Sequence, residues 1–222
     1  MQTLFEQRHN VIDHRYNVVT APLDFYVLVE GRHHPSRPSR ASFALQDWDG
    51  IQSIMLFVSP VDAEIRRRNV CGSEGKFKVC PLEAIDPRKF TYERGGELRL
   101  SVVYGFAAQE NMLLQGEDGI PCTLSYMNKF QFPLESLDGG HLVFRFSEEL
   151  LDWLIQAYRD VGLPDHHIMV REQAKCSMTR LDAIASEALL AAKTTTRDEG
   201  KPLQYAVYDT DEHQWRFADY PV

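Results

Sequence analysis

Apolar residues in the first two-thirds of the chain form short runs of strand length, separated by turn-forming residues. The run from Ile51 to Ser59 is continuous enough to form a strand that is buried on both faces. Aromatic and β-branched residues between Asp24 and Glu30 predict another strand. Further strands are expected at residues 42–45, 76–80, 97–106, 121–132 and 141–146. Pro60 is suited to open a helical turn after the central run.

The last third of the chain changes to a helical pattern. Ser147 is a good N-cap, and the apolar positions from Leu150 to Val161 recur on one face of a helix. A second helix is expected from Thr179 to Lys193, where alanine, leucine and glutamate dominate. Residues 167–171 fit either a short strand or the start of another helix. Alternating aromatic residues around a polar turn predict a β-hairpin over residues 203–220.

These segments together predict an α+β protein. We expect a predominantly antiparallel sheet, open or barrel-like, packed by C-terminal helices and completed by a C-terminal β-hairpin. No internal repeat, low-complexity tract or evident interdomain linker divides the chain. We therefore predict one α+β domain over residues 1–222, with a strand-rich body at 24–146, a helix-rich part at 147–200 and the hairpin at 203–220.

Two features of the helices allow specific predictions. Trp153 lies at the edge of the apolar face of the first helix and is expected to pack that helix against the sheet. The second helix carries a broad apolar stripe, which predicts a buried packing helix rather than a free coiled coil. One side of the stripe is also available for a two-fold mate, so a homodimer is an open alternative to a monomer. The stripe consists of Leu181, Ile184, Ala185, Ala188 and Leu189.

The composition is that of a globular protein, since 44% of the 222 residues are hydrophobic and 25% are charged. The apolar runs fall far short of the ~20 residues that a membrane-spanning helix requires. The N-terminal residues lack the pattern of a secretory signal, so we expect a cytoplasmic protein with no membrane contact. A net charge of -8 and an acidic pI near 5.5 argue against nonspecific nucleic-acid binding but not against a local basic patch.

The common catalytic and nucleotide-binding motifs are absent from the sequence. The chain has no phosphate-binding G-x-x-x-x-G-K-[ST] loop, no G-x-G-x-x-G, no H-E-x-x-H and no G-x-S-x-G. Their absence excludes only the enzymes that depend on them, because many hydrolases and nucleases use residues that are scattered along the chain. No cofactor is predicted.

Arginines between residues 31 and 70 provide the strongest candidate binding site. One group follows the first strand in a proline-stiffened loop, and the other ends the helical segment that begins at Pro60. Guanidinium groups offer planar, bidentate donors to phosphates and carboxylates. The alternatives are a solvated loop and a favourable interaction of the second group with the helix dipole. The arginines are Arg32, Arg37 and Arg40 in the loop, and Arg66, Arg67 and Arg68 in the helical segment.

Histidines, carboxylates and cysteines give weaker candidates. His33–His34 and His166–His167 are adjacent pairs, but neighbours on a strand point to opposite faces, so no metal site is predicted. The carboxylates at Asp47–Asp49 and Asp209–Glu212 fit turns better than a magnesium or calcium site. The four cysteines form no C-x-x-C pair and are expected to be free thiols.

The sequence therefore favours a non-catalytic binding or assembly protein that contacts a protein or nucleic-acid partner through the Arg-rich surface. The alternative is a hydrolase or nuclease that uses dispersed histidines and carboxylates, with or without a metal ion. Stoichiometric zinc, manganese or iron in the purified protein would favour the second hypothesis.

Overall fold

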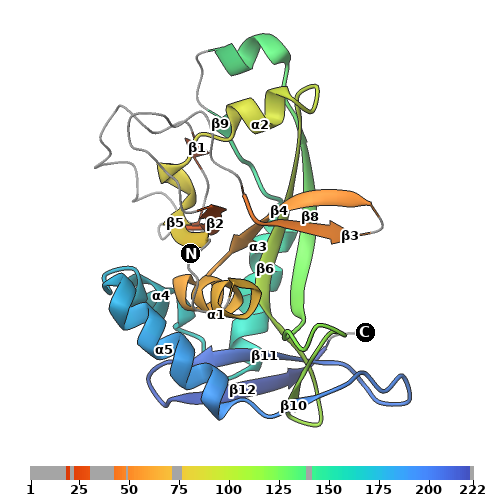
Figure 1. Ribbon diagram of the computed structural model, residues 1–222, viewed down its shortest axis with the longest axis vertical. Helices are drawn as coiled ribbons and strands as arrows, with labels where there is room; N and C mark the ends of the chain where they lie inside the picture. The colour runs from red at the N-terminus through yellow and green to blue at the C-terminus, as the bar shows by residue number, and fades with distance from the viewer. Residues whose placement is uncertain are drawn as a thin grey trace.

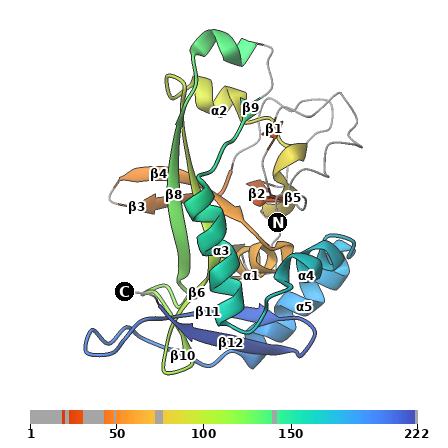
Figure 2. The same cartoon turned by 180° about the vertical axis from the view of Figure 1, so that it is seen from behind.

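In the computed structural model the chain forms a mixed β-sheet with helices on both faces (Figures 1 and 2). No helix of the placed residues is long and apolar enough to cross a bilayer. The residues that the structure describes are 19–20, 23–30, 43–48, 50–71, 77–138 and 142–220.

Twelve strands are defined within these residues. Those of the first half are β1 (Val19–Thr20), β2 (Tyr26–Glu30), β3 (Leu45–Trp48), β4 (Ile51–Phe57), β5 (Phe77–Pro81) and β6 (Glu97–Gln109). Those of the second half are β7 (Met112–Leu114), β8 (Thr123–Gln131), β9 (Leu142–Val143), β10 (Thr194–Thr195), β11 (Gln204–Asp209) and β12 (Gln214–Asp219).

The long strand β6 is the centre of the main sheet. It pairs with β8 and β7 along one side and with β4 and β11 along the other. Most ladders are antiparallel, as predicted, but β4 lies parallel to β6 because a helical crossover separates the two strands in the chain. The path of strands runs from β10 through β7, β6, β4 and β2 to β5. The sheet is therefore open and does not close into a barrel, and β11 and β12 form the expected C-terminal hairpin.

The helices follow the predicted pattern with adjusted bounds. The first helical segment extends to Cys71, beyond the three arginines that were expected to end it, and residues 167–171 are helical. Ser147 caps the first C-terminal helix, because its hydroxyl accepts the N–H of Leu150 at 3.2 Å. The α-helices are α1 (Pro60–Cys71), α2 (Arg88–Tyr92), α3 (Glu148–Asp160), α4 (His166–Gln173) and α5 (Met178–Ala191), and the 3-10 helices are η4 (Leu82–Ala84) and η5 (Leu134–Asp138).

Helices α1 and α3 lie on opposite faces of the sheet, as the two views show (Figures 1 and 2). The face toward α3 holds the largest core cluster, where Trp153 meets Tyr104 of β6 edge-on with ring centroids 4.2 Å apart. The phenol of Tyr205 in β11 donates to the carbonyl oxygen of Ala157 at 2.8 Å. The prediction that Trp153 packs its helix against the sheet is therefore confirmed.

Helix α5 packs against α1 and the β11–β12 hairpin (Figure 1). Its apolar stripe is buried with Val61 and Ile65 of α1 and with Phe106 of β6. The predicted buried packing helix is thus confirmed, and the stripe that was considered for a two-fold mate is used within the chain. The buried members of the stripe are Leu181, Ile184, Ala185 and Ala188.

Candidate functional site

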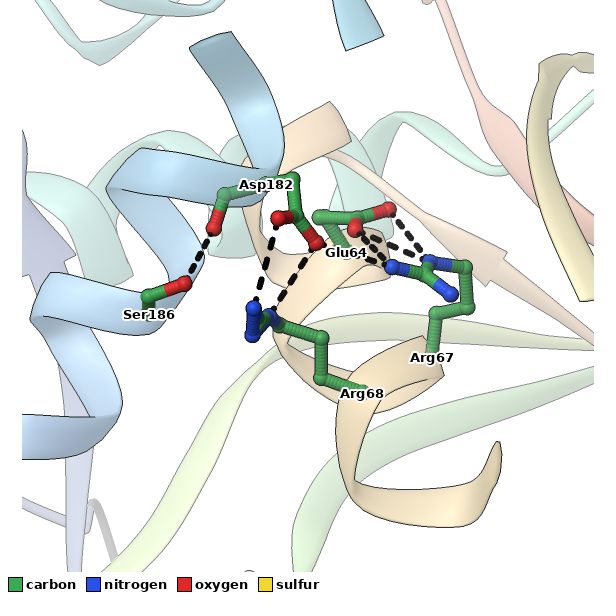
Figure 3. Close-up of polar contacts among 5 residues, drawn as sticks. All are labelled: Glu64, Arg67, Arg68, Asp182 and Ser186. Carbon is green, nitrogen blue, oxygen red and sulfur yellow. Dashed lines mark hydrogen bonds and ion pairs between the residues drawn. The ribbon is translucent and has the colours of Figure 1, made fainter. Parts of the chain in front are cut away.

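The arginines of α1 take part in contacts within the chain. The Arg67 guanidinium donates from Nε to both carboxylate oxygens of Glu64, at 2.9 and 2.8 Å, and from Nη2 to Asp182 of α5 at 3.0 Å (Figure 3). The Glu64 side chain is fully buried and that of Arg67 is 13% exposed. Because these charges are paired at the α1–α5 contact, Arg67 is a structural residue in this arrangement.

Arg68 joins the same network from the next position of the helix. Its Nε and Nη2 donate to the two oxygens of the Asp182 carboxylate at 3.2 and 3.3 Å (Figure 3). Ser186 donates to the main-chain carbonyl of Asp182 at 2.6 Å, one turn along α5. The Asp182 carboxylate therefore accepts hydrogen bonds from both arginines, and the network connects the C-terminal half of α1 to α5.

Arg66 points away from this network. Its Nη1 donates to the carbonyl oxygen of Pro121, which precedes β8, at 3.3 Å. Burial lowers the pKa of Arg66, and the nearby Asp118 carboxylate partly opposes that effect. The three consecutive arginines therefore do not form one surface patch, as the 100° spacing of helical residues leads one to expect. The loop arginines Arg32, Arg37 and Arg40 lie outside the described residues.

A buried polar cluster at the start of α1 links three parts of the fold. The Ser59 hydroxyl accepts the main-chain N–H groups of Val61 and Asp62 at 3.1 and 3.3 Å, which caps α1. The same hydroxyl donates to the side-chain carbonyl of Gln173 in α4 at 2.9 Å. Gln173 in turn donates to Thr210 in the β11–β12 turn at 3.4 Å. These side-chain hydrogen bonds thus connect α1, α4 and the turn of the β11–β12 hairpin.

Three ionisable side chains lie in the interior near this cluster. Asp62, Tyr158 and His166 are 1%, 5% and 5% exposed. Burial raises the pKa of Asp62 to about 7 and lowers that of His166 to about 3. Burial and the Asp62 carboxylate raise the pKa of Tyr158 well above its usual value. One polar atom of each (Asp62 Oδ2, the Tyr158 hydroxyl and His166 Nε2) has no hydrogen-bond partner within the described part of the chain.

Perturbed pKa values often mark active sites, but burial decides against that interpretation here. A substrate would have to reach groups that are at most 5% exposed. Asp62 was not among the candidate site residues predicted from the sequence. Asp62 lies between Val61 and Ile65, which are one helical turn apart and are both buried beside α5. This spacing of apolar residues was the sequence pattern from which a buried Asp62 could have been predicted.

The remaining sequence candidates have structural roles where they are described. Asp47 accepts the N–H of Gly50 at 2.9 Å, and Asp209 accepts the N–H groups of Asp211 and Glu212, as expected of turn residues. His33 and His34 lie outside the described residues. No group of three or more histidine, cysteine or acidic residues in the described ranges could hold a metal ion.

The cysteines that can be described are free thiols. Cys80, Cys122 and Cys176 are all partly buried and none forms a disulfide. Burial raises the pKa of both Cys80 and Cys122, which disfavours the thiolate that a nucleophile requires.

The outer edge of β8 carries main-chain groups that have no described strand beside them. Within the described residues β8 pairs only with β6. Phe132, directly after β8, donates its N–H to the carbonyl of Gly96 at 2.9 Å. In an antiparallel pair every second residue bonds to the neighbouring strand, so this bond shows which residues of β8 face β6 and which face outward. The residues that direct their main-chain N–H and C=O groups away from β6 are therefore Thr123, Ser125, Met127, Lys129 and Gln131.

Two large side chains are exposed at the middle of this strand. Tyr126 is 53% exposed on the face toward α3, and Met127 is 39% exposed on the opposite face. Lysines often protect sheet edges from pairing, but the Lys129 ammonium lies 2.6 Å from Glu97 of the adjacent β6. This ammonium lowers the pKa of Glu97. The positive charge of Lys129 is thus paired with a carboxylate of the neighbouring strand in the same sheet.

The β3–β4 hairpin crosses the sheet and projects past β8 in both views (Figures 1 and 2). Ser53 of the hairpin contacts Ser101 of β6 at 2.7 Å, and Gln46 accepts a hydrogen bond from Ser125 of β8 at 3.2 Å. By alternation Ile51 faces the same side as Ser53, and it is 39% exposed. We define the β8 edge site as the outer edge of Thr123–Gln131 together with Ile51 of the hairpin above it.

Comparison with known proteins gives no assignment for this arrangement. No family model, no curated protein and no solved structure matches the chain. The function must therefore be inferred from the geometry of the residues themselves.

Proposed function

We propose that this chain is a non-catalytic binding or assembly protein that joins a protein partner through the β8 edge site. The observation that carries the proposal is the outer edge of β8, where main-chain groups that no described strand pairs with flank the exposed Tyr126 and Met127. An extended segment can add to such an edge, with main-chain hydrogen bonds supplying affinity and alternate side chains supplying specificity.

The overhanging hairpin supports the same proposal. It covers one face of the space next to β8, so that an added strand meets Ile51 on one side. An edge bordered by an apolar side chain favours an extended polypeptide over a nucleic acid, whose phosphates require cationic donors. The net charge of -8 also favours a protein partner.

The α1 arginines Arg67 and Arg68 are not part of the β8 edge site. They pair with Asp182 of α5, which gives them a structural role within the chain. The loop arginines stay a separate proposal for anion binding, which a salt series can test. We place the activity in the cytoplasm, where free thiols such as those of Cys80, Cys122 and Cys176 persist.

The experiment is a pull-down from cells that also produce the untagged protein. The baits are the wild type, Met127→Lys at the site, and the matched control Leu190→Lys on α5, where the leucine is 89% exposed. We expect the wild type and the control to retain the same protein partner and Met127→Lys to lose it. Equal retention by all three baits, retention of nucleic acid alone, or no retained partner would contradict the proposal.

A further inference from the structure

We propose that the partner at the β8 edge site is a second copy of this chain, whose β8 adds in the antiparallel direction about a two-fold axis at Met127. This inference rests on the proposed function, because it identifies the partner of the same site. Two-fold dimers are the commonest oligomers, and their interfaces bring one surface of the chain against itself. A strand edge can do so only if its main-chain groups and side chains are self-complementary.

The main-chain groups of β8 meet this condition. Met127 is the middle residue of Thr123–Gln131 and directs its N–H and C=O groups outward. An axis at Met127 places this residue opposite itself, and it places Ser125 opposite Lys129 of the second copy. In each of these pairs both residues direct their main-chain N–H and C=O groups toward the other copy. Each pair therefore forms two N–H···O=C hydrogen bonds. A slip of one residue would instead bring outward groups against inward ones.

The side chains of β8 are also self-complementary. Lys129 is the only charged residue of the strand, and Glu97 of its own β6 lies 2.6 Å from its ammonium. In the two-fold arrangement Lys129 faces Ser125 of the second copy, so no like charges stand opposite each other. Leu124 faces Phe130 of the second copy, which continues the apolar face of the sheet toward α3.

The hairpins add a second contact on the other face. Each β3–β4 hairpin passes over Ser125 and projects beyond it, toward the position that Lys129 of the second copy takes. The exposed Ile51 then rests on the aliphatic part of that lysine. The hairpin of each copy thereby covers β8 of the other, which accounts for an exposed isoleucine beside an open strand edge.

Sedimentation velocity at micromolar concentration tests the inference. We expect the wild type to have twice the mass of one 25.5 kDa chain. Met127→Lys places two ammonium groups opposite each other at the axis and should give the single-chain mass. The control Leu190→Lys should stay dimeric. A monomeric wild type, a dimeric Met127→Lys, or a monomeric Leu190→Lys overturns the inference, the last because it places the interface on α5.

Two further measurements guard against loss of folding and against a wrong register. Met127→Lys should keep the circular dichroism spectrum of the wild type and melt within a few degrees of it. Ser125→Glu brings a carboxylate opposite Lys129 of the second copy on both sides of the axis. We expect it to lower the dimer dissociation constant about threefold to tenfold at low salt. A weakened Ser125→Glu dimer would contradict the register.

The outcomes also separate this inference from the proposed function. A monomeric wild type that retains another protein, and loses it on Met127→Lys, overturns the second copy while the proposed function stands. A monomeric wild type without any Met127-dependent partner overturns both. A dimer that dissociates only on Met127→Lys supports both.

Discussion

The imidazole of His166 stacks on the phenol of Tyr158, with ring centroids 3.4 Å apart and the ring planes 7° from parallel. This contact keeps the imidazole buried, and burial lowers the pKa of His166 to about 3. The Asp62 carboxyl, which interacts electrostatically with Tyr158, has a pKa that burial raises to about 7. At mildly acidic pH folding therefore places two groups in the interior as neutral species, although both are charged in the unfolded chain.

The two groups should give opposite pH dependences of stability. The folded pKa of Asp62 is raised from 3.8 to about 7, so its contribution is present below pH 3.8 and is lost as pH rises to 7. The folded pKa of His166 is lowered from 6.5 to about 3, so its contribution is present above pH 6.5 and is lost as pH falls toward 3. We expect the two slopes to cancel in the wild type between about pH 4 and 6.5.

Single substitutions should reveal each slope in urea denaturation at a series of pH values. Asp62→Asn leaves the histidine effect, so stability relative to wild type should rise with pH by up to about 1.4 kcal/mol per unit. His166→Phe keeps the ring stack, and its stability should fall with rising pH by a similar amount. The phenols of Tyr104, Tyr158 and Tyr205 do not interfere, because burial raises the pKa of each. Profiles parallel to the wild type would refute the assignment.

The edge-on contact of Trp153 with Tyr104 yields a second prediction. Trp153→Ala removes an indole that packs α3 on the core cluster, and we expect a loss of about 3 kcal/mol. This loss corresponds to a fall of about 6–12 °C in Tm for a chain of this size. Trp153→Phe keeps an aromatic ring against Tyr104 and should cost less than about 1.5 kcal/mol. Calorimetry that finds the alanine variant within a degree or two of wild type would disprove the packing role.

The fold was predictable where local patterns determine it. The apolar run that forms β4, Pro60 at the start of α1 and the Ser147 cap of α3 are read from a few neighbouring residues. The parallel pairing of Ile54 with Leu100 was not predictable, because strand order and direction depend on contacts between distant segments. The same reason explains why the sequence predicted strand β8 but not that its outer edge stands free of the other described strands.

The ion-pair network between α1 and α5 gives a third prediction. Glu64→Gln removes a fully buried charge and leaves the mostly buried Arg67 with a weaker partner, so we expect a loss of about 3 kcal/mol. Asp182→Asn makes the same chemical change at a side chain that is 42% exposed, and it should cost less than about 1 kcal/mol. Urea denaturation of both variants provides the comparison. Equal losses would show that burial does not set the energetics of this network.

This network also shows which contacts of the α1 arginines the sequence could not predict. From the sequence, Arg67 and Arg68 were candidates for a binding surface, with a favourable interaction with the helix dipole as the alternative. Their acceptor Asp182 is more than a hundred positions away, so only the folded chain brings the charges together. A local charge sum cannot distinguish a guanidinium that faces solvent from one that already has a carboxylate.

The loop arginines give the last prediction, which rests on sequence alone because they lie outside the described residues. If Arg32, Arg37 and Arg40 bind a polyanion, each phosphate contact contributes about 0.9 to the slope of log K against log salt for a DNA duplex. Replacing all three by alanine should therefore weaken binding of a short duplex and flatten its salt dependence by up to about 2.7 units. The matched control removes three exposed arginines elsewhere, Arg171, Arg180 and Arg197, and should leave the slope unchanged. Equal slopes for the two triple variants would show that the loop is a solvated connection, because the effect would then follow total charge and not position.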